Sequence, residues 1–245
     1  MNSQRLYIVT GSSSGLGLEI CKHLIKSNYK VLGISKSEGK INDSNYFHKI
    51  HDFKNKINIE DILNLKLNFK IEIYLILNAA QRFDSEYNEN NIFDLFLKSF
   101  DINFYNQIDF INKINKEMNF KKIFFISSFS IFTSGNETKD IGYYLAKDNF
   151  YKMTLLIKKH YKINSTCIMI GAMETKLLNE KPSTVASIPI IGKFLEKKLS
   201  LSSQDVAKKI IKNSDNNKDI ILIPYIPIFL LKLLIKIIEI IRLKK

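Results

Sequence analysis

The chain has few of the residues that mark secreted, metal-binding or nucleic-acid-binding proteins. Its 245 residues include no tryptophan, four histidines and two cysteines, Cys21 and Cys167. The cysteines lie far apart and fit no metal-ligand spacing, so we expect buried free thiols and no metal site. No arginine-rich run occurs, and basic residues do not alternate with aromatic ones. We therefore expect no nucleic-acid partner.

Acidic residues are also scarce relative to basic ones, and the formal net charge is +13. Lysines on solvated helix faces explain such a charge, as does attraction to anionic lipid or phosphorylated small molecules. No signal peptide is expected, because an apolar strand and a glycine turn begin within six residues of Met1. The prediction is a cytoplasmic protein.

Short apolar runs alternate with segments of helical periodicity along most of the chain. The runs are largely apolar, which is typical of parallel strands covered by helices on both faces, and predicts an α/β fold. The predicted strands cover 5–10, 30–35, 46–52, 71–79, 121–127, 164–170 and 219–224. The predicted helices cover 17–28, 58–66, 92–118, 143–160 and 203–213. Residues 1–224 are expected to form a single domain.

The stretch TGSSSGLG (10–17) follows the first strand and opens the first helix. In that position Gly11 permits a tight turn, Gly15 lets a pyrophosphate approach the backbone, and Gly17 allows close helix–strand packing. The helix N-terminus adds free N–H groups and a partial positive charge. A plain glycine–serine turn is the alternative. No Lys-Ser/Thr pair follows, which argues against an NTPase.

The second strand ends in ISKS (34–37), where an NAD-preferring site usually has an acidic residue. A basic residue suits a 2′-phosphate instead. Lys36, helped by Ser12, Ser13 or Ser35, therefore favours NADP(H) over NAD(H). The alternative is a surface lysine in a lysine-rich chain.

Six motifs follow one another in an order that resembles the short-chain dehydrogenase/reductase family, in its single-domain branch. They are TGSSSGLG (10–17), LNAA (77–80), DINF (101–104), FISS (125–128), YYLAK (143–147) and IGAMET (170–175). The resemblance covers residues 5–224. It implies a Rossmann-type, doubly wound parallel sheet, an NAD(P) cofactor, and hydride transfer between the cofactor and a carbonyl or alcohol.

The resemblance also implies roles for individual residues. The catalytic set would be Asn103, Ser128, Tyr143 and Lys147. Residues lining the cofactor would be Gly11, Ser14, Gly15, Leu16, Asp52, Asn78, Ala79, Tyr143, Lys147, Gly171 and Thr175. Lys36 and Ser13 join this set through the argument for a 2′-phosphate and not through the resemblance. Within this set Asp52 would meet the adenine, Asn78 and Ala79 the nicotinamide-side ribose, and Gly171 and Thr175 the carboxamide and pyrophosphate. The counterpart of Asn103 supports a water that passes protons to the lysine.

The chemistry of carbonyl reduction favours the same residue types. A serine hydroxyl such as that of Ser128 can orient the substrate oxygen while a tyrosine protonates it. A free tyrosine has a pKa of about 10, and a nearby ammonium favours the phenolate. Tyr143 and Lys147 lie four residues apart and share one helix face. Tyr144 is expected to be a packing or pocket residue.

Some positions depart from the family pattern. The usual Asn-Asn-Ala-Gly is Leu77-Asn78-Ala79-Ala80, and the usual proline before Gly171 is Ile170. Ser128 precedes Tyr143 by fifteen residues, about two more than is common in the family, and Ser130 fits the common interval better. Because ISS closes a strand, we favour Ser128 and keep Ser130 as the alternative.

The last part of the chain resembles the family least. Residues 176–201 alternate apolar runs with Pro182, Pro189 and Gly192, which predicts a lid and a hydrophobic substrate. Residues 225–245 predict an amphipathic cationic helix with one narrow polar stripe. It either lies on a membrane surface or packs against its own domain or a second subunit.

Two functions remain open at this point. The first is an NADP(H)-dependent oxidoreductase acting on a small carbonyl or alcohol. The second is a catalytically silent dinucleotide-binding regulatory or scaffold protein tethered by its C-terminal helix. By resemblance, a homodimer or homotetramer is expected through the two long helices near 92–118 and 143–160.

Overall fold

The computed structural model describes residues 5–64, 72–118, 120–129, 131, 139–171 and 201–224. Seven strands form one sheet in the order β3-β2-β1-β4-β5-β6-β7, and every neighbouring pair is parallel. The strands are β1 (Arg5–Thr10), β2 (Lys30–Ser35), β3 (Tyr46–Ile50), β4 (Glu72–Leu77), β5 (Phe120–Ser128), β6 (Ser165–Ile170) and β7 (Ile220–Ile223). This order is that of a doubly wound Rossmann-type sheet with one added strand, which confirms the predicted fold class.

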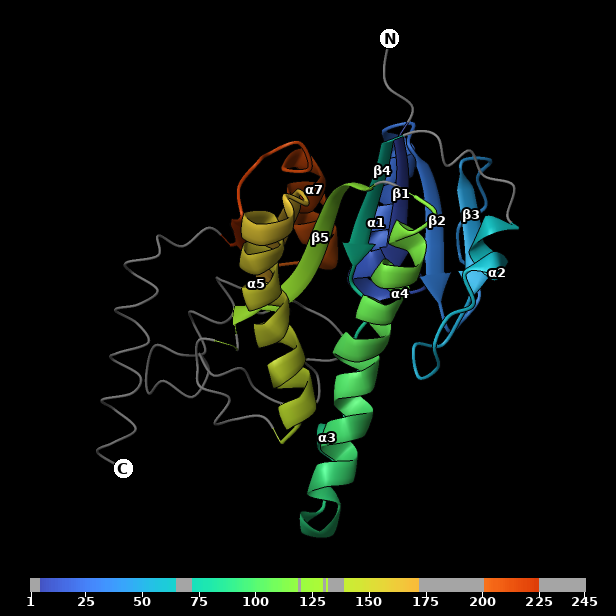
Figure 1. The fold of residues 1–245 in the computed structure, drawn as a ribbon. Helices are drawn as coiled ribbons and strands as arrows, with labels where there is room; N and C mark the ends of the chain where they lie inside the picture. Colours follow the sequence, from blue (N-terminus) through green and yellow to red (C-terminus); the bar gives the residue numbers. More distant parts are fainter. Residues whose placement is uncertain are drawn as a thin grey trace.

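Helices cover both faces of the sheet (Figure 1). The α-helices are α1 (Gly15–Lys26), α2 (Glu60–Leu63), α3 (Ile92–Phe100), α4 (Asn106–Asn115), α5 (Ile141–Tyr161) and α7 (Ser203–Lys212). Two short 3-10 turns, Asp84–Glu86 and Glu89–Asn91, precede α3. A π-helical segment, Asp101–Tyr105, joins α3 to α4.

Two large apolar clusters, one on each face of the sheet, form most of the core, and a small third cluster contains Ile131, Cys167 and Met169. Along β1 the side chains alternate: Leu6 and Ile8 pack with α3, α4 and α5, while Tyr7 and Val9 pack with α1 and α7. Helices α1 and α7 therefore cover one face, and α3, α4 and α5 cover the other (Figure 1). Cys21 and Cys167 are buried free thiols, as predicted.

The predicted elements agree with the observed ones apart from their ends, with one exception. A single helix was predicted over 92–118, whereas the structure has α3, the π-helical segment and α4, which ends at Asn115. Asn103 lies within the π-helical segment, and its side-chain Nδ2 donates to the carbonyl of Ser99 at 2.8 Å. The amide of Gln107 donates to the carbonyl of Asn103 at 3.1 Å. Side chains thus bond to backbone groups where the helix widens.

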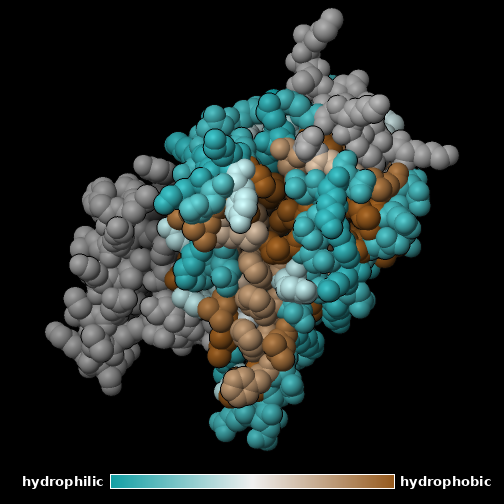
Figure 2. All heavy atoms as spheres, in the orientation of Figure 1, coloured by the Kyte–Doolittle hydropathy of each residue, from teal (hydrophilic) through white to brown (hydrophobic). Residues whose placement is uncertain are grey.

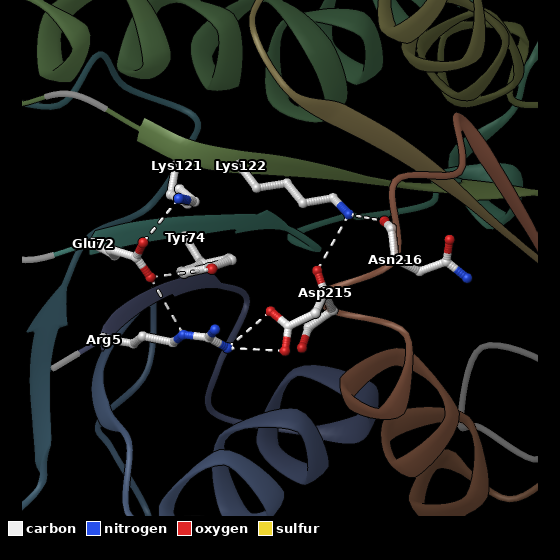
Figure 3. Close-up of polar contacts among 8 residues, drawn as sticks. Arg5, Glu72, Tyr74, Lys121, Lys122, Asp215 and Asn216 are labelled. Atoms are coloured by element: carbon white, nitrogen blue, oxygen red, sulfur yellow. Dashed lines mark hydrogen bonds and ion pairs between the residues drawn. The ribbon is translucent and has the colours of Figure 1, made fainter. Parts of the chain in front are cut away.

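A polar cluster lies at the amino ends of the strands, at the opposite edge of the sheet from their carboxyl ends (Figure 3). Arg5 pairs with Glu72 at 3.4 Å and with Asp215 at 2.9 Å. The buried ammonium of Lys122 donates to the carbonyl of Ser214 at 3.2 Å and also to that of Asn216. These contacts hold the turn between α7 and β7 against β1, β4 and β5.

Several predictions lie outside the described residues. They concern most of the lid at 176–201, the helix at 225–245, Thr175 and Ser130. Within the described part of the chain, none of the helices has the length and apolar character needed to cross a membrane.

Candidate active site

The predicted site residues gather at the carboxyl ends of the strands. Strand β1 pairs with β2 on one side and with β4 on the other, so the chain reverses its direction of winding between β1 and β4. In open parallel sheets, ligands bind in the crevice at such a switch point. The glycine turn follows β1, and LNAA contains the end of β4.

The glycine turn has the backbone that its sequence predicts. Gly11 has a φ of +70°, and a Cβ there would lie 2.8 Å from the Cα of Ala79. Gly15 has a φ of +53°, and a Cβ there would meet nothing within 4 Å. A Cβ on Gly17 would lie 2.1 Å from the carbonyl oxygen of Gly11. Two glycines thus allow close packing, and the third exposes the backbone at the start of α1.

The serines of the turn differ in exposure. Ser12 and Ser13 are buried, whereas Ser14 is exposed. Ser14 is the N-cap of α1 and has an extended backbone, but its side chain makes no capping hydrogen bond. Leu16 is buried beneath the start of the helix. The first amide groups of α1 therefore lie next to exposed residues, where an anion can reach them.

Thr10 fastens the end of β4 to the glycine turn. Its Oγ1 accepts hydrogen bonds from the backbone amides of Asn78 and Ala79, both at 2.9 Å. The Nδ2 of Asn78 donates to the carbonyls of Thr10 at 3.2 Å and Gly11 at 3.4 Å. Asn78 therefore uses its side chain to hold the turn, and this fixes the relative position of the two strand ends.

Lys36 and Asp52 follow β2 and β3 at the same edge. Lys36 is exposed, immediately after Ser35. Asp52 is half-buried, and its Oδ1 accepts a hydrogen bond from the backbone amide of Lys54 at 3.0 Å. The Asp52 carboxylate thus caps its own turn.

Tyr143 and Lys147 lie one turn apart on α5. The Lys147 Nζ is 5.5 Å from the centre of the Tyr143 ring and donates to the carbonyl of Ile126 at 2.9 Å. Ser127 Oγ donates to the carbonyl of Lys147 at 2.8 Å, so β5 and α5 are joined twice at this point. A Cβ on Gly142 would lie 2.5 Å from the carbonyl oxygen of Phe96, so glycine lets α5 approach α3 beside Tyr143.

Burial is the largest cause of the pKa shifts of Tyr143 and Lys147. It raises the pKa of Tyr143, against a lowering effect from the Arg82 guanidinium. It lowers the pKa of the almost fully buried Lys147 to about 8. The sequence predicts that a nearby ammonium favours the phenolate, and burial of Tyr143 acts in the opposite direction. The physical reason is that removal from water penalises the phenolate more than the nearby charge stabilises it.

Asn103 holds the loop that follows β4. Its Oδ1 accepts from the amide of Gln81 at 2.8 Å, and its Nδ2 donates to the carbonyl of Gln81 at 2.8 Å. The Nδ2 is also 3.0 Å from Ser99 Oγ. The side-chain amide is therefore engaged by the backbone of Gln81 and by Ser99, and it fixes Gln81 against the π-helical segment.

The remaining described site residues lie at the ends of β5 and β6. Ser128 is half-buried and closes β5. Gly171 follows β6, and its amide donates to the carbonyl of Ile223 at 2.8 Å. Tyr144 packs in a small cluster with Ile131 and Cys167, and its hydroxyl donates to the carbonyl of Ile131 at 3.2 Å.

Arg82 and Asp140 also lie beside Tyr143, and neither is among the predicted site residues. The Arg82 guanidinium carbon is 5.4 Å from the centre of the Tyr143 ring. Asp140 is the N-cap of α5: its carboxylate accepts from the amides of Tyr143 and Phe83, both at 2.8 Å. An aspartate three residues before Tyr143 is a helix-start signal that could have been recognised. No local pattern indicates Arg82.

Among the described residues, no group of histidine, cysteine and carboxylate side chains is arranged to hold a metal ion. No protein-family model matches the sequence, and no curated protein matches it. Solved structures do match. A 4-hydroxyisoleucine dehydrogenase complexed with NADH superposes with a TM-score of 0.67 at 16% identity, over 89% of this chain and 96% of that one.

Two further matches have the same architecture. A short-chain dehydrogenase family protein from Francisella tularensis has a TM-score of 0.67 at 20% identity, over 90% of this chain and 97% of that one. A short-chain dehydrogenase from Burkholderia cenocepacia in complex with NADP has a TM-score of 0.67 at 12% identity, over 90% and 88%. The resemblance predicted from the sequence is thus confirmed at the level of the fold.

Proposed function

We propose that this chain, which has the fold of the short-chain dehydrogenases, is an oxidoreductase of that family that transfers hydride between NADP(H) and a small carbonyl or alcohol. The observation that carries the proposal is the pairing of Tyr143 with Lys147, whose Nζ lies 5.5 Å from the tyrosine ring centre. The pair is on α5, and hydrogen bonds of Lys147 join this helix to the carboxyl end of β5. The tyrosine, as the proposed acid, and the lysine thus lie at the edge of the sheet where a nucleotide is expected to bind.

A dinucleotide fits the residues at this edge. Gly15 faces open space with its backbone exposed, as a site for a pyrophosphate requires. We assign the phosphates and adjoining ribose to the glycine turn, the nicotinamide-side ribose to Asn78, Ala79 and Lys147, and the adenine to the loop that carries Asp52. Gly171, with Thr175, is assigned to the carboxamide end. When bound, the cofactor supplies or accepts the hydride.

The protein's own part in the reaction is to move a proton and orient the substrate. In the direction of reduction, the Tyr143 hydroxyl donates its proton to the substrate oxygen, and Ser128 hydrogen-bonds that oxygen. The Lys147 ammonium and the positive charge of an oxidised nicotinamide both favour the phenolate and so offset the effect of burial. We assign Asn103 to positioning, because its amide holds Gln81 and the loop beside Tyr143.

The proposed preference for NADP(H) is based on this chain's own residues. Solved structures with the same fold include one complexed with NADH and another with NADP, so the fold agrees with either cofactor. Lys36 is exposed at the end of β2, where a basic side chain suits a 2′-phosphate. We therefore propose tighter binding of NADPH than of NADH.

The test combines cofactor binding with turnover. Fluorescence titration of the full chain with NADPH and NADH is followed by a panel of carbonyl substrates, using wild type, Tyr143→Phe and Tyr144→Phe. Tyr143→Phe should lower turnover by roughly 10²- to 10⁴-fold and leave NADPH binding unchanged, because only the transferred proton is lost. Loss of activity in Tyr144→Phe instead would move the role to the neighbouring residue. NADPH binding without turnover of any carbonyl would favour the silent binding protein.

A further inference from the structure

A chain of hydrogen bonds connects the segment after β2 to β3 and to the glycine turn. His48 Nε2 is 2.9 Å from the carbonyl oxygen of Ser37, and His48 Nδ1 is 2.9 Å from the Tyr46 hydroxyl. The Tyr46 hydroxyl is also 3.5 Å from Ser12 Oγ, at the outer limit of a hydrogen bond. Ser35 Oγ donates to the same carbonyl of Ser37 at 2.9 Å. The segment after β2, the strand β3 and the glycine turn are thereby linked.

These partners determine the tautomer of His48. A carbonyl oxygen can only accept, so Nε2 must carry a proton to bond to Ser37. In the neutral ring Nδ1 then accepts from the Tyr46 hydroxyl at 2.9 Å, and the single proton of that hydroxyl is not shared with the longer 3.5 Å contact to Ser12 Oγ. The ring of His48 is therefore held at both nitrogens, between a fixed tyrosine and the backbone of the segment.

Two glycines give the rings of Tyr46 and His48 their places. A Cβ on Gly33 would lie 2.3 Å from the Tyr46 hydroxyl oxygen and 2.5 Å from Ser12 Oγ. A Cβ on Gly39 would lie 2.9 Å from His48 Cγ. The tyrosine hydroxyl thus lies over the bare backbone of β2, and the backbone of Gly39 packs against the histidine ring.

Lys36 lies in the backbone segment that these contacts hold. Ser35 and Ser37 stand on either side of it and are bonded to each other, and His48 holds Ser37 from the neighbouring strand. The backbone at Lys36 is fixed while its side chain stays exposed. Because a lysine has a long flexible stem, a fixed backbone limits where its ammonium can reach and lowers the entropy lost on binding an anion.

We propose that Tyr46 and His48 are positioning residues that set cofactor specificity by holding the backbone on both sides of Lys36, so that its ammonium meets a 2′-phosphate. The inference rests on the proposed function, and specifically on Lys36 as the contact to that phosphate. Neither ring needs to touch the cofactor. Their effect should therefore appear only with the cofactor that carries the phosphate.

The experiment measures dissociation constants of the full-length chain for NADPH and NADH. His48→Leu should weaken NADPH binding by roughly two- to tenfold, the cost of immobilising one flexible side chain, with NADH binding unchanged. His48→Gln should restore most of the loss, because its amide N–H can donate to Ser37. Tyr46→Phe keeps the packing of the ring and should show the same selective loss as His48→Leu. Tyr29→Phe, which removes a hydroxyl just before β2 at the amino edge of the sheet, is the matched control and should change neither constant.

A second arm introduces Lys36→Met, which should remove the preference for NADPH. In that background His48→Leu should have no further effect on NADPH binding, because the two residues act through one contact. If Lys36→Met leaves the preference intact, the proposed cofactor specificity fails and the inference with it. If Lys36→Met removes the preference but His48→Leu and Tyr46→Phe weaken NADH as much as NADPH, only the inference is overturned. Unchanged binding of both cofactors in those two variants overturns it as well.

Discussion

Arg82 sets the electrostatic surroundings of Tyr143 together with Asp84. The Arg82 guanidinium faces the tyrosine ring at 5.4 Å, and its Nη2 pairs with Asp84 at 2.7 Å. Burial raises the pKa of Tyr143, Arg82 lowers it, and the carboxylates of Asp140 and Asp84 raise it. Arg82 is therefore the charge that opposes burial at the proposed proton donor.

Replacing Arg82 by methionine should raise the pKa of Tyr143 further. Loss of the cation removes the lowering effect and leaves the Asp84 charge, and both changes disfavour the phenolate. In the direction of alcohol oxidation the phenolate is the active form, so the rising limb of the pH–rate profile should move to higher pH by about 1 unit. Steady-state rates from pH 6 to pH 11 measure it.

Arg82→Lys is the matched variant, because it keeps the charge and should keep most of the profile. An unchanged profile in Arg82→Met, or a shift toward lower pH, would show that Arg82 does not act on Tyr143.

At the scale of single residues, the sequence predicts those site residues whose relative position follows from their local spacing. Tyr143 and Lys147 are four residues apart on one helix, so their shared face follows from helical geometry alone. Arg82 meets Tyr143 only because the loop after β4 is held by Asn103 and Asp140, a contact across about sixty residues of sequence. No periodicity within either segment carries that information.

Among the elements, the start of α5 depends on Asp140. Its buried carboxylate accepts from the amide of Tyr143 in α5 and from that of Phe83 in the loop after β4. Asp140→Ala should lower the free energy of unfolding by about 2–4 kcal/mol, because a helix cap and a buried acceptor are lost together. Urea unfolding followed by circular dichroism measures the change.

Ser202→Ala is the comparison for that cap. Ser202 caps α7 through one backbone amide, that of Asp205 at 3.1 Å, and its hydroxyl also donates to the exposed Asp205 carboxylate at 2.7 Å. Its loss should cost about 1 kcal/mol. Equal effects of the two substitutions would mean that the bond to Phe83 contributes nothing to stability.

Lys122 gives the sheet a pH-dependent stability. Burial is the main cause that lowers its pKa from 10.5 to about 8; the Lys158 ammonium adds to the effect and Asp215 opposes it. Between pH 8 and 10.5 the unfolded chain keeps a proton that the folded chain has lost, so this group's contribution to stability rises with pH. Below pH 8 the cost of burying the charge is fully present.

The free energy of unfolding of wild type minus that of Lys122→Met should therefore increase from pH 7.5 to pH 10, by at most about 3 kcal/mol. Taking the difference removes the contribution of groups common to both proteins, including Lys147. Urea titrations at several pH values measure it. A constant or falling difference contradicts the lowered pKa.

The elements themselves were predicted well where their apolar period is strong. Strands β1 and β2 have the predicted bounds, because each is a short buried run next to a turn. The π-helical segment at Asp101–Tyr105 was not predicted. The side chains of Asn103 and Gln107 bond to backbone carbonyls in or just before it and also to the backbone of Gln81 and Ala79, and no local pattern encodes those tertiary contacts.

For the whole molecule, the sheet order explains why residues from distant parts of the sequence meet at one edge. Every strand is parallel, so the glycine turn, Lys36, Asn78 and Gly171 follow carboxyl ends, and Ser128 is the last residue of β5 at the same edge. The alternation of strands and helices predicted this arrangement. The doubly wound arrangement, in contrast, was implied by the resemblance, and periodicity does not encode the order of the strands.

One face of the molecule has an apolar strip over α3 and α5 (Figure 2). The exposed large apolar or aromatic side chains of these two helices are Phe93 and Leu97 on α3 and Ile141, Leu155, Leu156 and Tyr161 on α5, with exposures from 36% to 81%. Water contact with so many large apolar groups is unfavourable, and such patches commonly mark interfaces. The resemblance to the short-chain dehydrogenase/reductase family implies association through the long helices near 92–118 and 143–160. A second copy of the chain that covers this strip stays a prediction.

Leu97→Glu combined with Leu156→Glu should then shift the protein to a monomer, because each charge would have to be buried against an apolar partner. Ile50→Glu is the matched control: Ile50 is 54% exposed at the end of β3 and should leave the assembly unchanged. Sedimentation equilibrium over a range of concentrations gives the mass of each variant. A wild-type chain that is monomeric throughout, or a double variant with unchanged mass, would mean that this strip is not the interface.

Because α5 also carries Tyr143 and Lys147, dissociation that lowered turnover without unfolding would show that the second copy stabilises the helix on which the proposed proton transfer depends.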